Sequence, residues 1–290
     1  MKCVIIVNSL SGNSMLVDVK GLTEVFGKDA DIIYIKEDTV LKDLSAYQRI
    51  VACGGDGTLN SVINCKLSPS AQLFYLPYGT FNESQHNATQ SPRLTELGKI
   101  GKRYFSYVCA AGIFTPLGYT VSPEKKKRYK RWAYFSKILK EYRVHRIKAQ
   151  FSLDGKSFEG EYALLMAIDS QRCFGFKFNK MYRQNDGLLH FLAIKAPSKN
   201  GFLGAVQLFF PLFRTFFVGF NKPHFSKNII FCPVKSVPLN VERTDFNVDG
   251  EKITVEGKTE IKVSHCRYKL EIVNRAQWQQ MQKQLKTSND

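Results

Sequence analysis

The chain has 290 residues, of which 44% are hydrophobic, enough for one large domain or two small ones with a sizeable core. Its formal net charge of +17 favours a polyanionic partner, such as nucleic acid, an anionic membrane surface or a phosphorylated substrate. The seven cysteines are scattered without CxxC spacing, which argues against a disulfide framework and a zinc site. Because no secretory signal and no run of about 18 uninterrupted apolar residues occurs, we expect a cytoplasmic protein.

The first 80 residues alternate between apolar strand patterns and helical patterns. We expect strands at 2–7, 31–35, 50–53 and 73–76, and helices at 13–26, 40–47 and 58–65. Such alternation predicts an α/β nucleotide-binding domain, in which a parallel sheet is covered by helices on both faces. Ligands bind such sheets at the carboxyl ends of the strands.

Strand patterns dominate the rest of the chain, and they predict a β-sandwich-like second domain. They lie at 104–110, 147–153, 162–168, 188–194, 229–232, 237–247, 252–256, 261–263 and 268–273. Asp154-Gly155 and Asp249-Gly250 are hairpin-turn signals between them. Helical patterns occur at 124–144, at 202–220 and in the tail at 275–285. For 202–220 we favour a core helix, with a lipid anchor as the alternative. We therefore expect a nucleotide-binding domain at 1–92, with 275–290 packing back on it, and a β-rich substrate domain at 93–274.

A glycine-rich loop follows the third expected strand. The strand leads into Gly54-Gly55-Asp56-Gly57, and Thr58-Leu59-Asn60 begins the next helix. Three glycines in four positions let the backbone approach a ligand closely. The free amides and positive dipole end of the helix suit nucleotide phosphates. Because Asp56 would repel a bare phosphate, it indicates Mg²⁺ between the two.

The loop at 54–60 resembles the nucleotide loop of the diacylglycerol kinase catalytic-domain superfamily, which includes bacterial diacylglycerol kinases and sphingosine kinases. NAD kinases share its GGDGT core. Four further segments resemble motifs of the same superfamily, in its order and across nearly the whole chain. They are Asn8-Ser9-Leu10-Ser11-Gly12, Leu76-Pro77-Tyr78-Gly79-Thr80-Phe81-Asn82, Asp186-Gly187-Leu188-Leu189 and Asp249-Gly250-Glu251. The resemblance implies the two-domain NAD-kinase/diacylglycerol-kinase-like fold, with an active site in the cleft between the domains.

The resemblance also implies roles for individual residues. The segment 54–60 would hold the phosphates of ATP, and Asn8, Thr39, Gly79 and Thr80 would line the same pocket. Glu251 lies where the superfamily places its catalytic base, and we expect Asp56 to act with it. From the residues alone, Asp249-Gly250 is a hairpin turn and Glu251 a solvated strand residue. The implied activity is ATP-dependent phosphorylation of a lipid hydroxyl, with diacylglycerol giving phosphatidic acid.

A magnesium site is implied in the second domain. Asp186 matches a structural Mg²⁺ ligand of the superfamily, and the backbone carbonyls of Arg183 and Leu188 match its other ligands. The chain departs from the superfamily pattern at 83–88, at Phe174-Gly175-Phe176 and at Phe114, where a glycine is usual. These departures leave two alternatives open: a kinase of another small alcohol, NAD-kinase-like, or a non-catalytic protein that binds nucleotide or anionic membrane.

The segment 124–148 carries eleven Lys and Arg against two Glu, with interleaved aromatic residues such as Trp132 and Tyr134. This composition suits an anionic membrane surface. We therefore expect a lipid substrate and peripheral contact with the inner face of the membrane through 124–148. A solvated basic face is the simpler interpretation of the same pattern. No nucleic-acid-binding motif occurs, so we expect no nucleic-acid partner, and a homodimer is left open.

Overall fold

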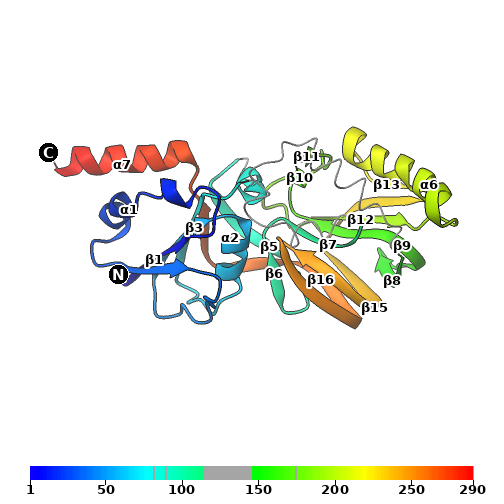
Figure 1. Cartoon of the computed structure of the whole chain (residues 1–290), viewed down its shortest axis with the longest axis horizontal. Coiled ribbons are helices and arrows are strands. Elements are labelled where there is room, and N and C mark those ends of the chain that lie inside the picture. Colours follow the sequence, from blue (N-terminus) through cyan, green and yellow to red (C-terminus); the bar gives the residue numbers. More distant parts are fainter. Residues whose placement is uncertain (81, 89, 114–145, 174, 290) are drawn as a thin grey trace. The chain divides into compact units, whose positions relative to one another are not determined.

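The computed structural model describes residues 1–80, 82–88, 90–113, 146–173 and 175–289 (Figure 1). The chain divides into two compact units. Unit 1 comprises Met1–Thr95 and His265–Asp290, and unit 2 comprises Glu96–Ser264. The expected helix at 124–144 and most of the basic segment 124–148 lie outside the described residues.

Unit 1 is built on a parallel sheet in the strand order β2-β1-β3-β4, and the end of one long strand, β16, pairs in parallel with β4. The apolar runs of β1, β3 and β4 form buried strands, as the sequence predicted, because helices and neighbouring strands cover them. The strands are β1 (Cys3–Asn8), β2 (Asp31–Ile35), β3 (Arg49–Gly54), β4 (Gln72–Pro77) and β16 (Glu251–Ile272).

Helices α1 (Val19–Phe26) and α7 (Arg275–Asn289) pack on one face of this sheet. The Asp18 side chain accepts the amide of Gly21 and so caps the start of α1. Trp278 of α7 stacks on Phe26 with ring centroids 6.1 Å apart, which joins the C-terminal helix to the N-terminal part of the unit. Helix α2 (Asp56–Ile63) directly follows β3.

Two expectations for unit 1 are wrong. Residues 40–47 form no helix, and Asp43 instead makes an isolated bridge with Lys66. The single helix expected at 13–26 is divided into a short 3₁₀ turn, η1 (Ser14–Leu16), and α1, because the Asp18 cap starts a new helix. Strand β5 (Arg93–Ile100) and the 3₁₀ turn η2 (Glu83–Asn87) were not expected from the sequence.

Unit 2 is an antiparallel sheet in the order β13-β14-β12-β9-β7-β15-β16, in which β8 pairs with both β9 and β15. Residues of β15 and β16 are buried in one cluster with residues of β12 and β14, which agrees with the expected sandwich-like packing. The remaining strands are β6 (Arg103–Phe105), β7 (Val108–Gly112), β8 (Ile147–Leu153), β9 (Lys156–Ile168), β10 (Arg172–Cys173), β11 (Phe176–Lys177), β12 (Leu189–Lys195), β13 (His224–Phe225), β14 (Ile229–Val234) and β15 (Ser236–Val248).

Both predicted hairpin turns are present. Asp154 and Asp249 have φ values of 47° and 52°, and each is followed by a glycine that also has a positive φ. The three strands expected at 252–256, 261–263 and 268–273 are instead one strand, β16. Gly257 has a φ of 77° and pairs with Val241 next to a bulge in β15, where two residues of β15 face one of β16, so the glycine lies beside a bulge and does not end the strand.

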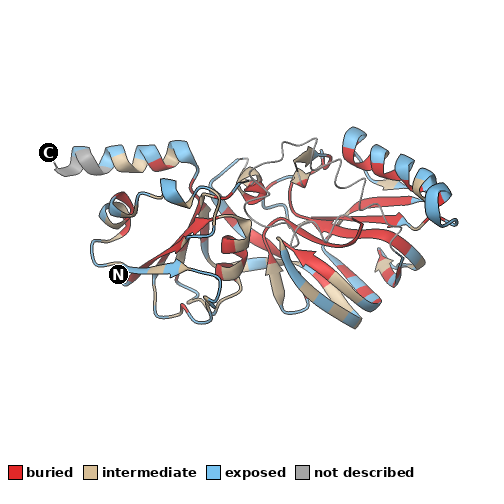
Figure 2. Ribbon diagram, in the orientation of Figure 1, coloured by how far each residue is buried: buried red, intermediate tan, exposed pale blue. Residues whose placement is uncertain are grey.

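The expectation of a core helix at 202–220 is only half right. Helix α6 (Gly201–Phe213) continues into a π-helical turn, η3 (Arg214–Val218). Leu208, Leu212 and Phe216 are buried against the sheet of unit 2, but the outward side of the same helix is exposed (Figure 2). By length and composition, 201–218 is also a candidate membrane span, although Gln207 and Arg214 interrupt its apolar residues.

Candidate active site

The ends of three parallel strands of unit 1 carry the residues that the sequence analysis assigned to nucleotide binding. Asn8 ends β1, Gly54 ends β3 and Pro77 ends β4. The carbonyl oxygen of Gly54 accepts the amides of Tyr78 (2.7 Å) and Gly79 (3.1 Å), so the loop after β3 and the loop after β4 are directly joined. The carboxyl edge of this sheet is therefore the candidate nucleotide site.

Glycine is required where the two loops meet. A Cβ added to Gly79 would lie 2.5 Å from the Cα of Gly55 and 2.3 Å from Asn82 Oδ1. Asn82 has a left-handed backbone (φ 45°), and its Nδ2 donates to the carbonyl of Gly79 at 2.9 Å. Asn13 Nδ2 also donates to that carbonyl, at 3.1 Å. The two backbones thus touch, and the surrounding amide side chains hold them in place.

In the glycine loop and the first turn of α2, the backbone and the side chains differ in how far they are exposed. Asn8 Nδ2 donates to Thr58 Oγ1 at 2.8 Å, which ties the end of β1 to the first turn of α2. Thr58, Leu59 and Asn60 are almost completely buried. Gly55, which precedes the helix, is only half-buried. At this loop, amides at the start of α2 are therefore more accessible to a ligand than the Thr58 and Asn60 side chains are.

The carboxylate of Asp56 points into the unit. It accepts the amides of Glu83 (2.7 Å) and Ser84 (3.1 Å) and the hydroxyl of Tyr75 (3.4 Å). Burial raises the pKa of Asp56, while the hydrogen bonds from Ser84, Glu83 and Tyr75 act in the opposite direction. Asp56 thus holds the start of η2 against the glycine loop. The sequence pattern does not reveal this role, because the partners lie 27 and 28 residues further along the chain.

The other two candidate nucleotide residues lie in loops. Thr39 closes a turn after β2, in which its Oγ1 accepts the amide of Lys36 at 2.9 Å and its amide donates to the Lys36 carbonyl at 3.1 Å. Thr80 is exposed in the loop after β4, directly after Gly79. The structure therefore brings Asn8, Gly54 and Gly79 together.

In unit 2, Asp249 anchors the hairpin that carries Glu251. The buried Asp249 carboxylate accepts the amides of Ser106, Tyr107 and Val108, the last two at 3.0 Å. It also accepts the Ser106 hydroxyl at 2.9 Å. Glu251 follows at the start of β16 and is exposed. Asp249 therefore fixes the turn while Glu251 faces solvent, a difference that the tripeptide alone does not reveal.

Asp186 lies in a loop of unit 2 beside buried acids that the sequence analysis did not single out. Asp186 Oδ1 accepts the amide of Leu188 at 3.1 Å, and the buried Glu96 carboxylate accepts the amide of Gly187 at 2.9 Å. Burial, followed by the negative charges of Glu96 and Asp186, raises the pKa of Asp169 well above its usual range. Burial also raises the pKa of Asp186, opposed by the Leu188 amide and Arg183.

This acidic surrounding is compatible with a divalent cation. One carboxylate together with backbone carbonyls is a donor set that Mg²⁺ accepts, and the neighbouring acids would favour positive charge. In the described part of the chain, however, no group of three or more His, Cys, Asp or Glu side chains has a metal-binding arrangement. A cation at Asp186 would depend on the carbonyls of Arg183 and Leu188.

One glycine of unit 2 is required by packing. Gly112, at the end of β7, has a φ of 102°, and an added Cβ would lie 2.2 Å from the carbonyl oxygen of Ala163. Phe114 and Phe174, the departures expected to add bulk, lie outside the described residues. The departure at 83–88 forms η2, in which Ser84 and Asn87 are buried.

An α/β unit whose glycine loops meet at the carboxyl edge of a parallel sheet has the architecture of a nucleotide-binding protein. Comparisons with known proteins find similarity to diacylglycerol kinases. Residues 2–98 match the model of the diacylglycerol kinase catalytic domain. The resemblance to that superfamily, first seen in the motifs, is thereby confirmed.

Relatives extend the similarity beyond the first unit. The diacylglycerol kinase of Bacillus subtilis (strain 168) is 26% identical over 233 residues, which covers 72% of each protein. That of Staphylococcus carnosus (strain TM300) is 24% identical over 225 residues, covering 71% of this chain and 70% of the relative. A crystal structure of a diacylglycerol kinase from Bacillus anthracis str. Sterne has a TM-score of 0.65 at 19% identity, covering 93% of this chain and 96% of that chain. This likeness shows a shared fold.

Proposed function

We propose that the chain is an ATP-dependent lipid kinase that transfers the γ-phosphoryl group to the hydroxyl of diacylglycerol, giving phosphatidic acid. The observation that carries the proposal is the junction of Gly54, Gly55 and Gly79 at the carboxyl edge of the unit 1 sheet. There, the start of α2 offers backbone amides to phosphate oxygens. The similarity to diacylglycerol kinases over 72% of the chain supports the lipid acceptor.

In the proposed reaction, the residues mainly position the groups. Phosphoryl transfer needs alignment, charge neutralisation and a group that takes the hydroxyl proton. The amides at the start of α2 would hold the phosphates, and Asp56 would keep the two glycine loops together from within the unit. Glu251 would accept the proton of the lipid hydroxyl at a carboxylate oxygen, and the bonds from Asp249 to 106–108 would position the hairpin that carries it.

We propose two binding sites for Mg²⁺. As part of the ATP complex it would neutralise phosphate charge during transfer. A second ion would be held by Asp186 and the carbonyls of Arg183 and Leu188, where the acids Glu96 and Asp169 lie close enough to interact electrostatically. We assign this second ion a structural role, because Asp186 lies in a loop whose amides are tied to Glu96 and to Asp186 itself.

A screen of labelled ATP against a total lipid extract tests the proposal. We expect one labelled product that comigrates with phosphatidic acid and disappears when Mg²⁺ is chelated. A labelled water-soluble product instead would favour a kinase of another small alcohol. No label in any product, together with measurable ATP binding, would favour a non-catalytic nucleotide-binding protein. The departure from the superfamily pattern at 83–88, beside the Asp56 carboxylate, gives that alternative its physical basis.

A further inference from the structure

The outward side of α6 and η3 is an apolar surface on unit 2, hereafter the phenylalanine face. Its side chains recur at helical spacing, and each has between 43% and 81% of its surface exposed. They contrast with the buried inward side of the same helix (Figure 2). The phenylalanine face consists of Phe202, Leu203, Val206, Phe209, Phe210, Phe213, Phe217 and Val218.

The phenylalanine face is preformed as a row of stacked rings. Phe209 stacks on Phe213 with centroids 5.8 Å apart, and Phe213 stacks on Phe217 at 5.1 Å. Phe217 also meets Phe176 of β11 edge-on at 5.4 Å. Rings held by one another lose little conformational freedom when a further surface covers them, so this face is ready for an apolar partner.

The helix that carries this face is fixed to the sheet. Leu208, Leu212 and Phe216 are buried with residues of β9, β12 and β14. At Gly204, an added Cβ would lie 2.2 Å from the carbonyl oxygen of Lys199, so the helix start packs closely on its own entry loop. Because one side of the helix is packed into this core, the helix can lie on a membrane surface but cannot separate from the core to span the membrane.

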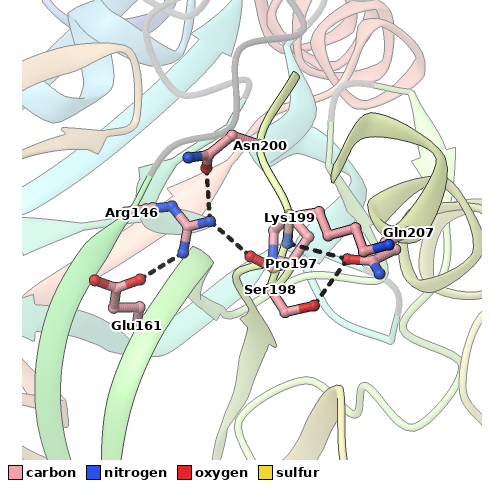
Figure 3. A network of polar contacts seen from close by, with 7 residues as sticks. All are labelled: Arg146, Glu161, Pro197, Ser198, Lys199, Asn200 and Gln207. Carbon is pink, nitrogen blue, oxygen red and sulfur yellow. Dashed lines mark hydrogen bonds and ion pairs between the residues drawn. The ribbon is translucent and has the colours of Figure 1, made fainter. Parts of the chain in front are cut away.

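Polar contacts hold the start of the helix in place (Figure 3). Arg146 donates to the carbonyl of Pro197 and to Asn200 Oδ1, both at 2.8 Å, and it forms an ion pair with Glu161 of β9. Gln207 Oε1 accepts the Ser198 hydroxyl at 3.3 Å. Gln207, the polar residue on the outward side of α6, is thus engaged with the entry loop and leaves the phenylalanine face apolar.

Within the stretch 187–241, which contains the phenylalanine face, all formally charged side chains are positive. No Asp or Glu occurs between Asp186 and Glu242. Phe225 of β13 is a further exposed aromatic side chain in this stretch. Six basic residues lie in it, five of them exposed: Lys195, Lys199, Arg214, Lys222, Lys227 and Lys235.

We propose that the phenylalanine face docks flat on an anionic phospholipid bilayer, with its aromatic rings in the headgroup boundary and the flanking lysines on lipid phosphates. Exposed Phe on a helix with a basic surround is the pattern of an interfacial helix. A protein partner would have to bury this face against complementary side chains, whereas a bilayer needs only apolar depth and negative charge. The proposal goes beyond phosphotransfer, because binding to vesicles is measured without ATP.

Cosedimentation of the full chain with vesicles tests this proposal. We expect binding to vesicles of phosphatidylglycerol and phosphatidylcholine, and much weaker binding to phosphatidylcholine alone. The double variant Phe209→Ser/Phe213→Ser should bind the anionic vesicles at least about tenfold more weakly. The matched control is Met15→Ser/Leu16→Ser, which removes two exposed apolar side chains from unit 1 and should bind as the wild type does.

A charge-reversal pair tests the electrostatic part. Lys222→Glu/Lys227→Glu should weaken binding to anionic vesicles by about tenfold or more, since each lysine near such a surface contributes about 1 kcal/mol. The control pair Lys258→Glu/Lys269→Glu changes exposed lysines of β16 and should have a smaller effect. Thermal unfolding would confirm that each variant is folded.

Two outcomes would overturn the proposal. Unchanged vesicle binding by the Phe209→Ser/Phe213→Ser variant would place membrane contact elsewhere, for example on the basic segment 124–148. A wild-type dimer in sedimentation that this variant converts to a monomer, with vesicle binding unchanged, would make the phenylalanine face a contact between two copies of the chain. Neither vesicle binding nor sedimentation measures kinase activity, so either outcome would overturn the membrane proposal without affecting the proposed function.

Discussion

The junction of the two glycine loops predicts the effect of adding one methyl group. In Gly79→Ala, the new Cβ would lie 2.5 Å from the Gly55 Cα and 2.3 Å from Asn82 Oδ1. Because one of these neighbours is backbone, the loops must separate, and such overpacking typically costs about 1–3 kcal/mol. If the free protein relieves this overlap by moving the loops apart, ATP binding must bring them together again at the same free-energy cost. ATP affinity should then fall by about fivefold to 150-fold.

Two further variants should show smaller or no loss of ATP affinity. In Gly55→Ala the added Cβ would lie 3.3 Å from the Gly79 Cα, so a small shift suffices and the loss of ATP affinity should be milder. Gly155→Ala, in a unit 2 hairpin with φ 77° and no atom within 4 Å of the added Cβ, should cost about 1–2 kcal/mol of stability through backbone strain alone. It should leave ATP binding unchanged.

Calorimetric titration with ATP, combined with urea unfolding, separates these cases. We expect the order wild type, Gly55→Ala, Gly79→Ala for decreasing ATP affinity, with Gly155→Ala equal to the wild type. The reasoning would be refuted if Gly79→Ala bound ATP as tightly as the wild type, or if Gly155→Ala lost as much affinity as Gly79→Ala.

Three further predictions follow from buried polar groups. Asp56→Asn places a side-chain amide opposite the backbone amides of Glu83 and Ser84. Both the melting temperature and the rate of ATP turnover should therefore fall. A loss of turnover with an unchanged melting temperature would contradict the anchoring role and indicate a purely chemical one. Asp249→Asn should lower the free energy of unfolding by about 1.5–3 kcal/mol, whereas Asp154→Asn, in the other hairpin, should change it by less than about 0.5 kcal/mol. Burial lowers the pKa of His190 to about 4, so the unfolded chain binds this proton more readily, and stability should fall by up to about 3 kcal/mol as the pH drops from about 6.5 to 4. His190→Phe should remove this part of the pH dependence in urea titrations.

The sequence predicted most of the unit 1 sheet because its strands are continuous apolar runs that end at glycine or polar residues. It failed at 40–47, where a helical spacing of apolar residues lies in a loop. It also failed at β16, where Gly257 looks like a strand break but lies within one long strand, next to a bulge of the paired strand β15. In both places tertiary pairing overrides the local pattern.

The candidate site was predictable only in part. The positions of Gly54 and Gly79 followed from turn chemistry and motif order. The anchoring roles of Asp56 and Asp249 did not, because their partners are backbone amides 27 to 143 residues away. The apolar composition of 202–220 fits either a core helix or a lipid anchor, so it did not show that one side of α6 is buried and the other exposed.

The proposed function is tested most directly by phosphoryl transfer from labelled ATP to purified diacylglycerol in mixed micelles. The account predicts labelled phosphatidic acid from the wild-type chain. Glu251→Gln should form it at least about 100-fold more slowly, and Glu256→Gln, which changes another exposed glutamate of β16, should form it at the wild-type rate. No phosphatidic acid from the wild type, or equal rates for the two glutamate variants, would contradict the account.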